Sequence, residues 1–232
     1  VSVLAFTDGK TVVPMISSMD HKRALDGDCG LNTGGMGTIA PNPFYTKEIA
    51  ARCMETIFQP TIEAMRAEGR AFRGCLYFGL MLTADGPKVI EYNCRFGDPE
   101  TQVVLPLLKS DLLSIMQATT NGTLTSEMVE FSDECAACVV MASGGYPKSY
   151  STGYTIDIPD ALLDSVYVAG AKLENGRLKT GTRRLRDGKN TARGAGHSVS
   201  ECRTHSFQRR ALPPGHRRSG ACGSRGELTD GL

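Results

Sequence analysis

The chain has 232 residues, of which 41% are hydrophobic, so it can bury a sizeable core in one large domain or two small ones. It has no apolar run of about 18 residues and does not begin with a signal-peptide pattern, which excludes a membrane-spanning helix and predicts a cytosolic protein. The eight cysteines are scattered, as expected of reduced thiols. Residues 1–180 hold 15 Lys and Arg against 21 Asp and Glu, a net −6, so the remainder carries +7 of the total of +1. The two parts are therefore interpreted separately.

The first elements form a predicted β-hairpin, in which Val1–Phe6 and Thr11–Met15 flank an Asp-Gly turn. No turn or cap precedes Val1, which predicts that the sequence begins inside a domain and that an upstream part is absent. Residues 17–43 are rich in Asp and Gly and show no periodicity. We expect a long loop there, of the kind that is usually functional or disordered.

The middle of the chain alternates predicted helices and strands. An apolar stripe predicts a helix over Lys47–Glu68, which Pro60 should kink or split. The remaining expected elements are a hairpin of Arg73–Thr83 with Pro87–Asn93, a helix that Asp98 caps with Pro99 in its first turn, a helix over Asp111–Thr119 that Asn121-Gly122 ends, and strands at Cys135–Ser143 and Ser165–Ala169. The last two strands belong to a smaller β-rich unit that begins near residue 130.

The strand that ends at Asn93 carries the strongest chemical signal. Residues two apart on a strand share a face, so Glu91 and Asn93 present two oxygen ligands about 7 Å apart. Such oxygens suit Mg²⁺ or Mn²⁺, which keep the rest of their coordination shell for phosphates. Arg95, one alternation further on, can brace an anion with its planar set of donors. The alternative is a sheet-edge Glu and Asn that simply face solvent.

A glycine-rich segment in the predicted loop gives the second signal. Gly34, Gly35 and Gly37 allow successive backbone N–H groups to face an anion, and Lys22 and Arg23 add positive charge. This combination favours phosphate binding. The alternative is a flexible surface loop.

Together these segments resemble the ATP-grasp ligases, and specifically the phosphoribosylamine–glycine ligases. The resemblance rests on D-H-K-R at Asp20–Arg23, G-x-N-T-G-G-M-G at Gly30–Gly37, and I-E-x-N-x-R-F-G-D-P-E-T-Q-V-V-L-P at Ile90–Pro106. It extends over residues 1 to about 180. Related carboxylases share the Glu-x-Asn strand but not the continuation after it.

The resemblance implies an ATP-dependent ligation of glycine to 5-phosphoribosylamine through a glycyl phosphate. Glu91 and Asn93 match the family's metal ligands for Mg²⁺ or Mn²⁺, and Arg95 matches the arginine that steadies the acyl phosphate. The matching positions for substrate and phosphate binding are Lys22, Arg23, Asn32, Thr33, Gly34, Gly35, Gly37, Gly97 and Asp98. Many superfamily members have a second carboxylate where this chain has Gly79, so Glu91 should bear more of the metal binding. The family's N-terminal domains, which complete the ATP site, precede the segment that matches Val1.

The tail after Thr180 departs from the family. It holds ten Arg residues and no amphipathic period, a composition that predicts disorder. Bases that can encode Leu212–Arg218 read one position later as Cys-Arg-Arg-Asp-Ile-Gly, which resembles the family's ending. We therefore interpret the tail as a translated frameshift, with a basic nucleic-acid-binding arm as the alternative.

The sequence thus predicts an α+β protein in three parts. Residues 1–129 form the C-terminal lobe of an ATP-grasp domain, 130–180 a truncated small β-rich domain, and 181–232 the aberrant tail. We expect small-molecule substrates, no membrane partner and no nucleic acid. The alternatives are another ATP-grasp ligase or carboxylase, or a non-enzymatic module that binds metal or nucleotide. The isolated chain is expected to be inactive.

Overall fold

The computed structural model describes residues 1–181 and the backbone of residues 193–199. Its first layer is a four-stranded antiparallel sheet with the order β2 (Val12–Pro14), β1 (Ser2–Thr7), β7 (Gly74–Thr83) and β8 (Gly86–Asn93). Both predicted hairpins are confirmed. The first turn is fixed by Asp8, whose Oδ1 accepts hydrogen bonds from the backbone N–H groups of Lys10 and Thr11 at 3.0 and 2.8 Å.

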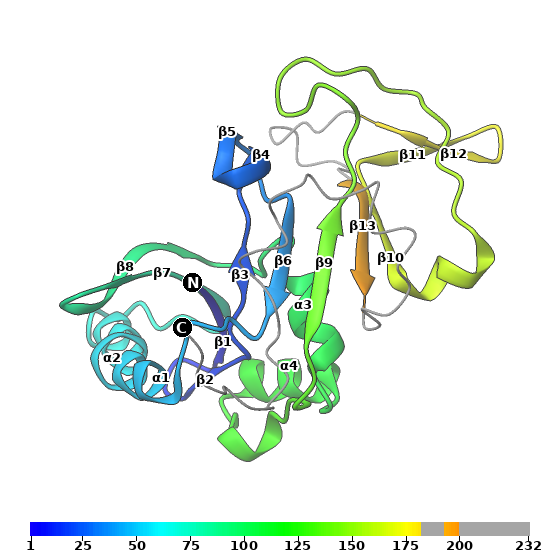
Figure 1. Ribbon diagram of the computed structural model, residues 1–232. Helices are drawn as coiled ribbons and strands as arrows, with labels where there is room; N and C mark the ends of the chain where they lie inside the picture. Colours follow the sequence, from blue (N-terminus) through cyan, green and yellow to red (C-terminus); the bar gives the residue numbers. More distant parts are fainter. Residues whose placement is uncertain (182–192, 200–232) are drawn as a thin grey trace, which may run out of the picture.

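Helices cover one face of this sheet (Figure 1). They are α1 (Lys47–Cys53), the π-helical turn η2 (Met54–Phe58) and α2 (Gln59–Ala67). The predicted helix is present and its backbone stays helical throughout, but the π-helical turn η2 interrupts its regular pattern just before Pro60, which cannot donate a helical hydrogen bond. Phe58 packs on Phe78 of β7 with ring centroids 4.3 Å apart. This contact lies in a core cluster that ties the helices to the sheet.

Shorter helices lie against part of the other face. They are α3 (Thr101–Val104), η3 (Leu105–Leu107), α4 (Leu112–Asn121) and η4 (Ser126–Met128). Their buried side chains join Leu4, Phe6 and Tyr77 in a second core cluster. The helix predicted at Asp111–Thr119 is confirmed, because Asp111 caps α4 and Gly122 ends it with a φ of 75°.

The predicted cap at Asp98 is wrong. Helix α3 begins only at Thr101, its first turn receives no side-chain cap, and Asp98 Oδ1 instead accepts a hydrogen bond from Gln102 Nε2 at 3.0 Å. Gln102, one turn further on, thus offers the Asp98 carboxylate a side-chain donor.

A second sheet has the order β10 (Val166–Ala169), β13 (Arg193–Val199), β9 (Ala136–Val140), β6 (Gly37–Ala40) and β3 (Met19–Asp20). The predicted strands after Cys135 and Ser165 are confirmed. The expectation of one long loop over residues 17–43 is wrong, because the short strands β3 and β6 lie in it. These strands are two to four residues long, too short to show alternation, and β6 pairs with β9 about a hundred residues later.

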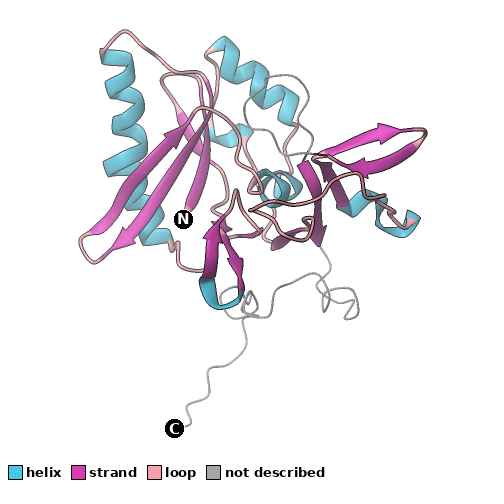
Figure 2. Cartoon of the chain, turned by 90° about the horizontal axis from the view of Figure 1, so that it is seen from above, coloured by secondary structure: helices cyan, strands magenta, loops and turns pink. Residues whose placement is uncertain are grey.

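Two hairpins project from the sheets (Figure 2). The first joins β4 (Arg23–Leu25) and β5 (Cys29–Asn32) through the turn η1 (Asp26–Asp28). The second joins β11 (Ala171–Glu174) and β12 (Arg177–Thr180), and follows the helical turn η5 (Asp160–Ser165). The second sheet contains strands from both sides of the domain boundary expected near residue 130, because β6 precedes that residue and β9 follows it.

The expected disorder of the tail is wrong for Arg193–Val199, which forms β13 between β9 and β10. Strand pairing uses main-chain groups, so a segment without an apolar period can still fill a gap between two strands. The rest of the tail, including the region of the frameshift hypothesis, lies outside the described residues.

Two further predictions concern cysteines and membranes. Among the described residues, Cys29, Cys53, Cys75 and Cys94 are free thiols, as expected, whereas Cys135 is in a disulfide bond, so the expectation of reduced cysteines is wrong there. Pairing depends on distance in the fold, which sequence spacing does not record. Within the described residues, no helix is both long and apolar enough to span a membrane.

Candidate active site

Strand β8 carries the predicted metal ligands on the sheet face away from α1 and α2. Glu91 pairs with Gly79 and Asn93 with Tyr77, so these four residues share a face. The strand register shifts at Ile90, which has no partner on β7. Glu91 and Asn93 both come after this shift, so it does not separate them. The predicted arrangement of Glu91 and Asn93 on one face is therefore present.

The two side chains touch, because Asn93 Nδ2 donates a hydrogen bond to Glu91 Oε1 at 3.2 Å. Half a turn of the amide about its last side-chain bond would place Asn93 Oδ1 beside the carboxylate. Two neighbouring oxygens of this kind fit Mg²⁺ or Mn²⁺ bound jointly with phosphates. Within the described residues, no three or more His, Cys, Asp or Glu side chains cluster as a complete metal site, so phosphate oxygens would have to supply further ligands.

Gly79 sets the space beside Glu91. A Cβ atom at this glycine would lie 3.0 Å from Glu91 Cγ, closer than side chains normally pack. The register places Gly79 directly opposite Glu91, on the same face of the sheet. In this chain the absence of a side chain leaves room for the Glu91 carboxylate.

Arg95 follows the strand and is exposed. Its Nη1 donates to the Phe96 carbonyl at 2.7 Å, and its Cζ lies 6.0 Å from the centre of the Tyr77 ring. These contacts hold the guanidinium near the face that carries Asn93, because Tyr77 is the strand partner of Asn93. The group remains open to an anion.

A buried polar network, which the sequence did not reveal, lies under this region. Glu100 is only 3% exposed, and its Oε1 accepts hydrogen bonds from Ser2 Oγ at 3.1 Å and Tyr77 Oη at 3.0 Å. Asp20 lies nearby, and its Oδ1 is buried with no hydrogen-bond partner among the described residues. Burial, and secondarily the charge of Glu100, raises the pKa of Asp20 to about 7. Both acids stand in the quoted motifs, but only the fold shows that they are buried.

The glycine-rich segment is held against this network by close packing. Gly35 has a φ of 116°, and a Cβ there would lie 2.4 Å from Pro99 Cδ and 2.7 Å from Asp20 Oδ1. Only glycine fits. Gly35 N–H donates to Thr33 Oγ1 at 3.0 Å, and Gly34 N–H donates to Tyr146 Oη at 3.3 Å.

The other predicted residues of the segment lie in or beside the hairpin of β4 and β5. Lys22 and Asn32 are exposed, and Arg23 Nη1 donates to the Gly30 carbonyl at 2.7 Å. Gly37 lies in β6, where a Cβ would approach the Cys138 carbonyl oxygen of β9 to 2.8 Å. Gly37 is thus needed for strand pairing, whatever else it does.

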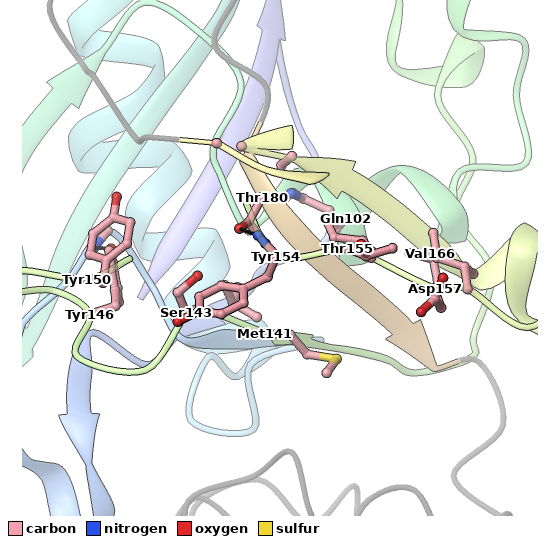
Figure 3. Close-up of a pocket in the computed structure, with 18 of the residues that line it drawn as sticks. Gln102, Met141, Ser143, Tyr146, Tyr150, Tyr154, Thr155, Asp157, Val166 and Thr180 are labelled. Carbon is pink, nitrogen blue, oxygen red and sulfur yellow. Dashed lines mark hydrogen bonds between the residues drawn. The ribbon is translucent and has the colours of Figure 1, made fainter. Parts of the chain in front are cut away.

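A cavity of about 390 Å³ joins part of the predicted site to the later part of the chain. Gly34, Gly35 and Asp98 line it together with Gln102, and residues 140–159 supply much of the opposite wall (Figure 3). Gly97 and Asp98 also line a neighbouring hollow. The structure therefore brings three predicted residues together here, while Glu91, Asn93 and Arg95 lie outside the cavity on the sheet face.

Comparison with known proteins places this geometry in a family. The family described as "Phosphoribosylglycinamide synthetase, ATP-grasp (A) domain" matches residues 1–101. Phosphoribosylamine–glycine ligase of Clostridium acetobutylicum is 50% identical over 179 residues, which cover 77% of this chain and 43% of that protein. The trifunctional purine biosynthetic protein adenosine-3 of Gallus gallus is 50% identical over 184 residues, covering 78% of this chain and 18% of that one.

A solved structure agrees with the sequence relatives. The crystal structure of phosphoribosylamine–glycine ligase from Thermotoga maritima matches with a TM-score of 0.73 and 33% identity, over 85% of this chain and 46% of that one. The chain thus spans less than half the length of these ligases. The Glu91–Asn93 strand, the glycine-rich segment and these likenesses agree, and the chain belongs to the phosphoribosylamine–glycine ligase family with an ATP-grasp fold.

Proposed function

We propose that this chain forms part of an enzyme that joins glycine to 5-phosphoribosylamine and converts ATP to ADP and phosphate. In the first step the glycine carboxylate attacks the terminal phosphorus of ATP, which gives glycyl phosphate and ADP. The amine of phosphoribosylamine then attacks the glycyl carbonyl, phosphate leaves, and an amide bond forms. The observation that carries the proposal is the contact between Glu91 and Asn93 on an exposed sheet face, in a chain of this family.

The chain's own groups would mainly position charge. Glu91 and Asn93 would hold Mg²⁺ or Mn²⁺, which when bound neutralises the negative charge of the phosphates. Arg95 would brace the acyl phosphate with donors that its contact with the Phe96 carbonyl leaves available. Positioning and electrostatic stabilisation are the main contributions that a protein makes to phosphoryl transfer.

The remaining predicted residues would bind substrate and phosphate groups. Lys22 and Arg23 offer exposed positive charge, and Asn32 and Thr33 lie in and just beyond the strand that follows. The rest of the substrate-binding surface would be formed by Gly34, Gly35, Gly37, Gly97 and Asp98. Gly35 N–H and Gly34 N–H already have protein acceptors, so these two glycines would shape the substrate site and would not donate to a phosphate.

The partners that we propose are the two small substrates and the N-terminal part that the longer relatives possess. That part would supply the other wall of the nucleotide site. A cytosolic location and the absence of a nucleic-acid partner stay predictions. The division into units 1–129, 130–180 and 181–232 is likewise part of the proposal.

The test is a chimera in which the N-terminal part of the Clostridium acetobutylicum ligase precedes Val1. We expect ADP release that requires glycine and phosphoribosylamine together. ADP release with bicarbonate instead of glycine would indicate a carboxylase, and nucleotide binding without turnover would indicate a non-enzymatic module. Either result would contradict the proposal.

A further inference from the structure

We propose that the cavity between the glycine-rich segment and residues 140–159 binds the sugar of the phosphoribosyl substrate, a pentose that bears a primary amine, and leaves its phosphate outside. This inference rests on the proposed function and adds a site to it. A volume of about 390 Å³ is in the range of small-molecule pockets. Figure 3 shows the lining side chains gathered from both parts of the chain.

The charged side chains that line the cavity are both hydrogen-bond acceptors. The carboxylates of Asp98 and Asp157 both line it, and no Lys, Arg or His stands among its described lining residues. A phosphate dianion would lose its hydration there without gaining a cation, which is costly. Sugar hydroxyls and an amine are hydrogen-bond donors, so they match these acceptors. The lining therefore selects the amino-sugar end of the substrate.

The opposite wall supplies a broad apolar surface. Tyr146 and Tyr150 pack edge to face with ring centroids 5.7 Å apart, and Tyr154 and Met141 lie beside them in the lining. Figure 3 shows the Tyr154 ring beside Ser143. The C–H faces of a pentose can pack on such side chains, while the hydroxyls around the ring turn toward the polar wall.

Gln102 supplies the most specific contact. Its Nε2 donates to Asp98 Oδ1 at 3.0 Å, so its Oε1 is the acceptor end, and that oxygen is buried with no donor among the described residues. A buried acceptor without a hydrogen bond lowers the stability of the folded protein. The amide can turn about its broad terminal torsion toward a ligand, and a hydroxyl or amine would then satisfy it.

Binding can be tested on the 232-residue chain itself, with ribose 5-phosphate as the probe and NMR spectroscopy of the labelled protein as the readout. We expect saturable shifts of the Gln102 side-chain amide and of the Gly34 and Gly35 backbone amides. An excess of inorganic phosphate should not reverse them. Competition by phosphate, or shifts confined to residues outside the cavity, would overturn the proposal.

Variants on each wall separate the cavity from general effects. Gln102→Leu removes the acceptor and Tyr154→Ala removes part of the apolar wall, and each should weaken ribose 5-phosphate binding by about tenfold. Gln117→Leu is the matched control, because Gln117 is exposed on α4 and lies outside the cavity. Unchanged binding in both cavity variants, with their folds intact by NMR, would overturn the proposal.

The chimera distinguishes this inference from the proposed function. If ligation proceeds and Gln102→Leu raises the KM for phosphoribosylamine but not for glycine or ATP, both hold. If ligation proceeds and Gln102→Leu and Tyr154→Ala leave every KM unchanged, the sugar lies elsewhere while the function stands. If the chimera binds ribose 5-phosphate in the cavity but forms no product, the function fails and the cavity remains a sugar site.

Discussion

Glu91 and Asn93 are the residues whose contact most directly supports metal-nucleotide chemistry. In the chimera, we expect Glu91→Ala and Asn93→Ala each to lower turnover by about 100-fold or more, because a coordinating oxygen is lost where phosphate charge must be neutralised. Glycine-dependent ADP formation at saturating substrate is the measurement. Lys88→Ala, on the same strand and before the register shift, serves as the control. Wild-type rates in both mutants would remove these residues from the metal site.

Asp20 makes the stability of the chain depend on pH. Its pKa is raised from 3.8 to about 7, first by burial and then by the charge of Glu100, while Lys22 opposes the change. Between these two values the folded protein keeps a proton that the unfolded chain has lost. At Asp20 the folded state therefore binds more protons, so the contribution of Asp20 to the free energy of unfolding falls as the pH rises from about 4 to about 7.

The Asp20→Asn variant tests this effect, because an amide resembles the protonated acid and does not ionise. Denaturant unfolding at pH 5 and pH 8 should show a fall for the wild type that exceeds the fall for the variant by roughly 1–4 kcal/mol. The comparison cancels the contributions of other titrating groups. Equal falls in the two proteins would show that Asp20 ionises normally in the fold.

At the scale of elements, the glycine-rich segment should be sensitive to one added methyl group. Gly35→Ala would force a Cβ to within 2.4 Å of Pro99 Cδ, whereas Gly74→Ala, at a comparable φ of 136°, meets nothing closer than 3.6 Å. Both changes strain the backbone, but only the first also overpacks. We expect Gly35→Ala to be less stable than Gly74→Ala by about 1–3 kcal/mol, or roughly 2–10 °C in Tm by calorimetry. A smaller loss at Gly35 than at Gly74 would contradict the packing seen here.

Elements set by local chemistry were predictable from the sequence. The two hairpins carry Asp-Gly turns, and α4 has an Asp cap and a closing glycine, so each signal lies within the element itself. The same is true of Glu91 and Asn93, because the period of a strand alone places them on one face. These predictions needed no knowledge of distant contacts.

The features that the sequence did not predict depend on distant partners. Strands β3 and β6 carry no visible alternation. β6 pairs with β9, and β3 pairs with β6 at the edge of the same sheet. Glu100 is buried against Ser2, which lies 98 residues away in the sequence. The cavity is similar, since Gln102 and Tyr154 meet only after the chain has folded. The local pattern at Asp98 predicts a helix cap, yet Gln102 offers the Asp98 carboxylate a competing donor.

At the scale of the molecule, strand β9 joins residues on both sides of the boundary expected near residue 130. It pairs with β6 from Gly37↔Val139 to Ala40↔Ala136, and its Ala136 and Cys138 are buried in the cluster that contains Leu4 and Phe6. A chain that ends before β9 therefore exposes one side of that core. The first unit should not keep its full stability without the start of the second.

Two truncated chains test this dependence, one ending at Glu130 and the other at Gly181. The longer chain keeps both core clusters, whereas the shorter one loses β9 and leaves β6 without its long-range partner. We expect the shorter chain to melt on the order of 10 °C lower by circular dichroism, because losing a paired, buried strand costs several kcal/mol. Amide exchange of β6 and α3 should accelerate most, since these elements lie against β9. Equal melting temperatures and equal protection would instead mean that residues 1–129 fold as an independent domain and that β9 only docks on it.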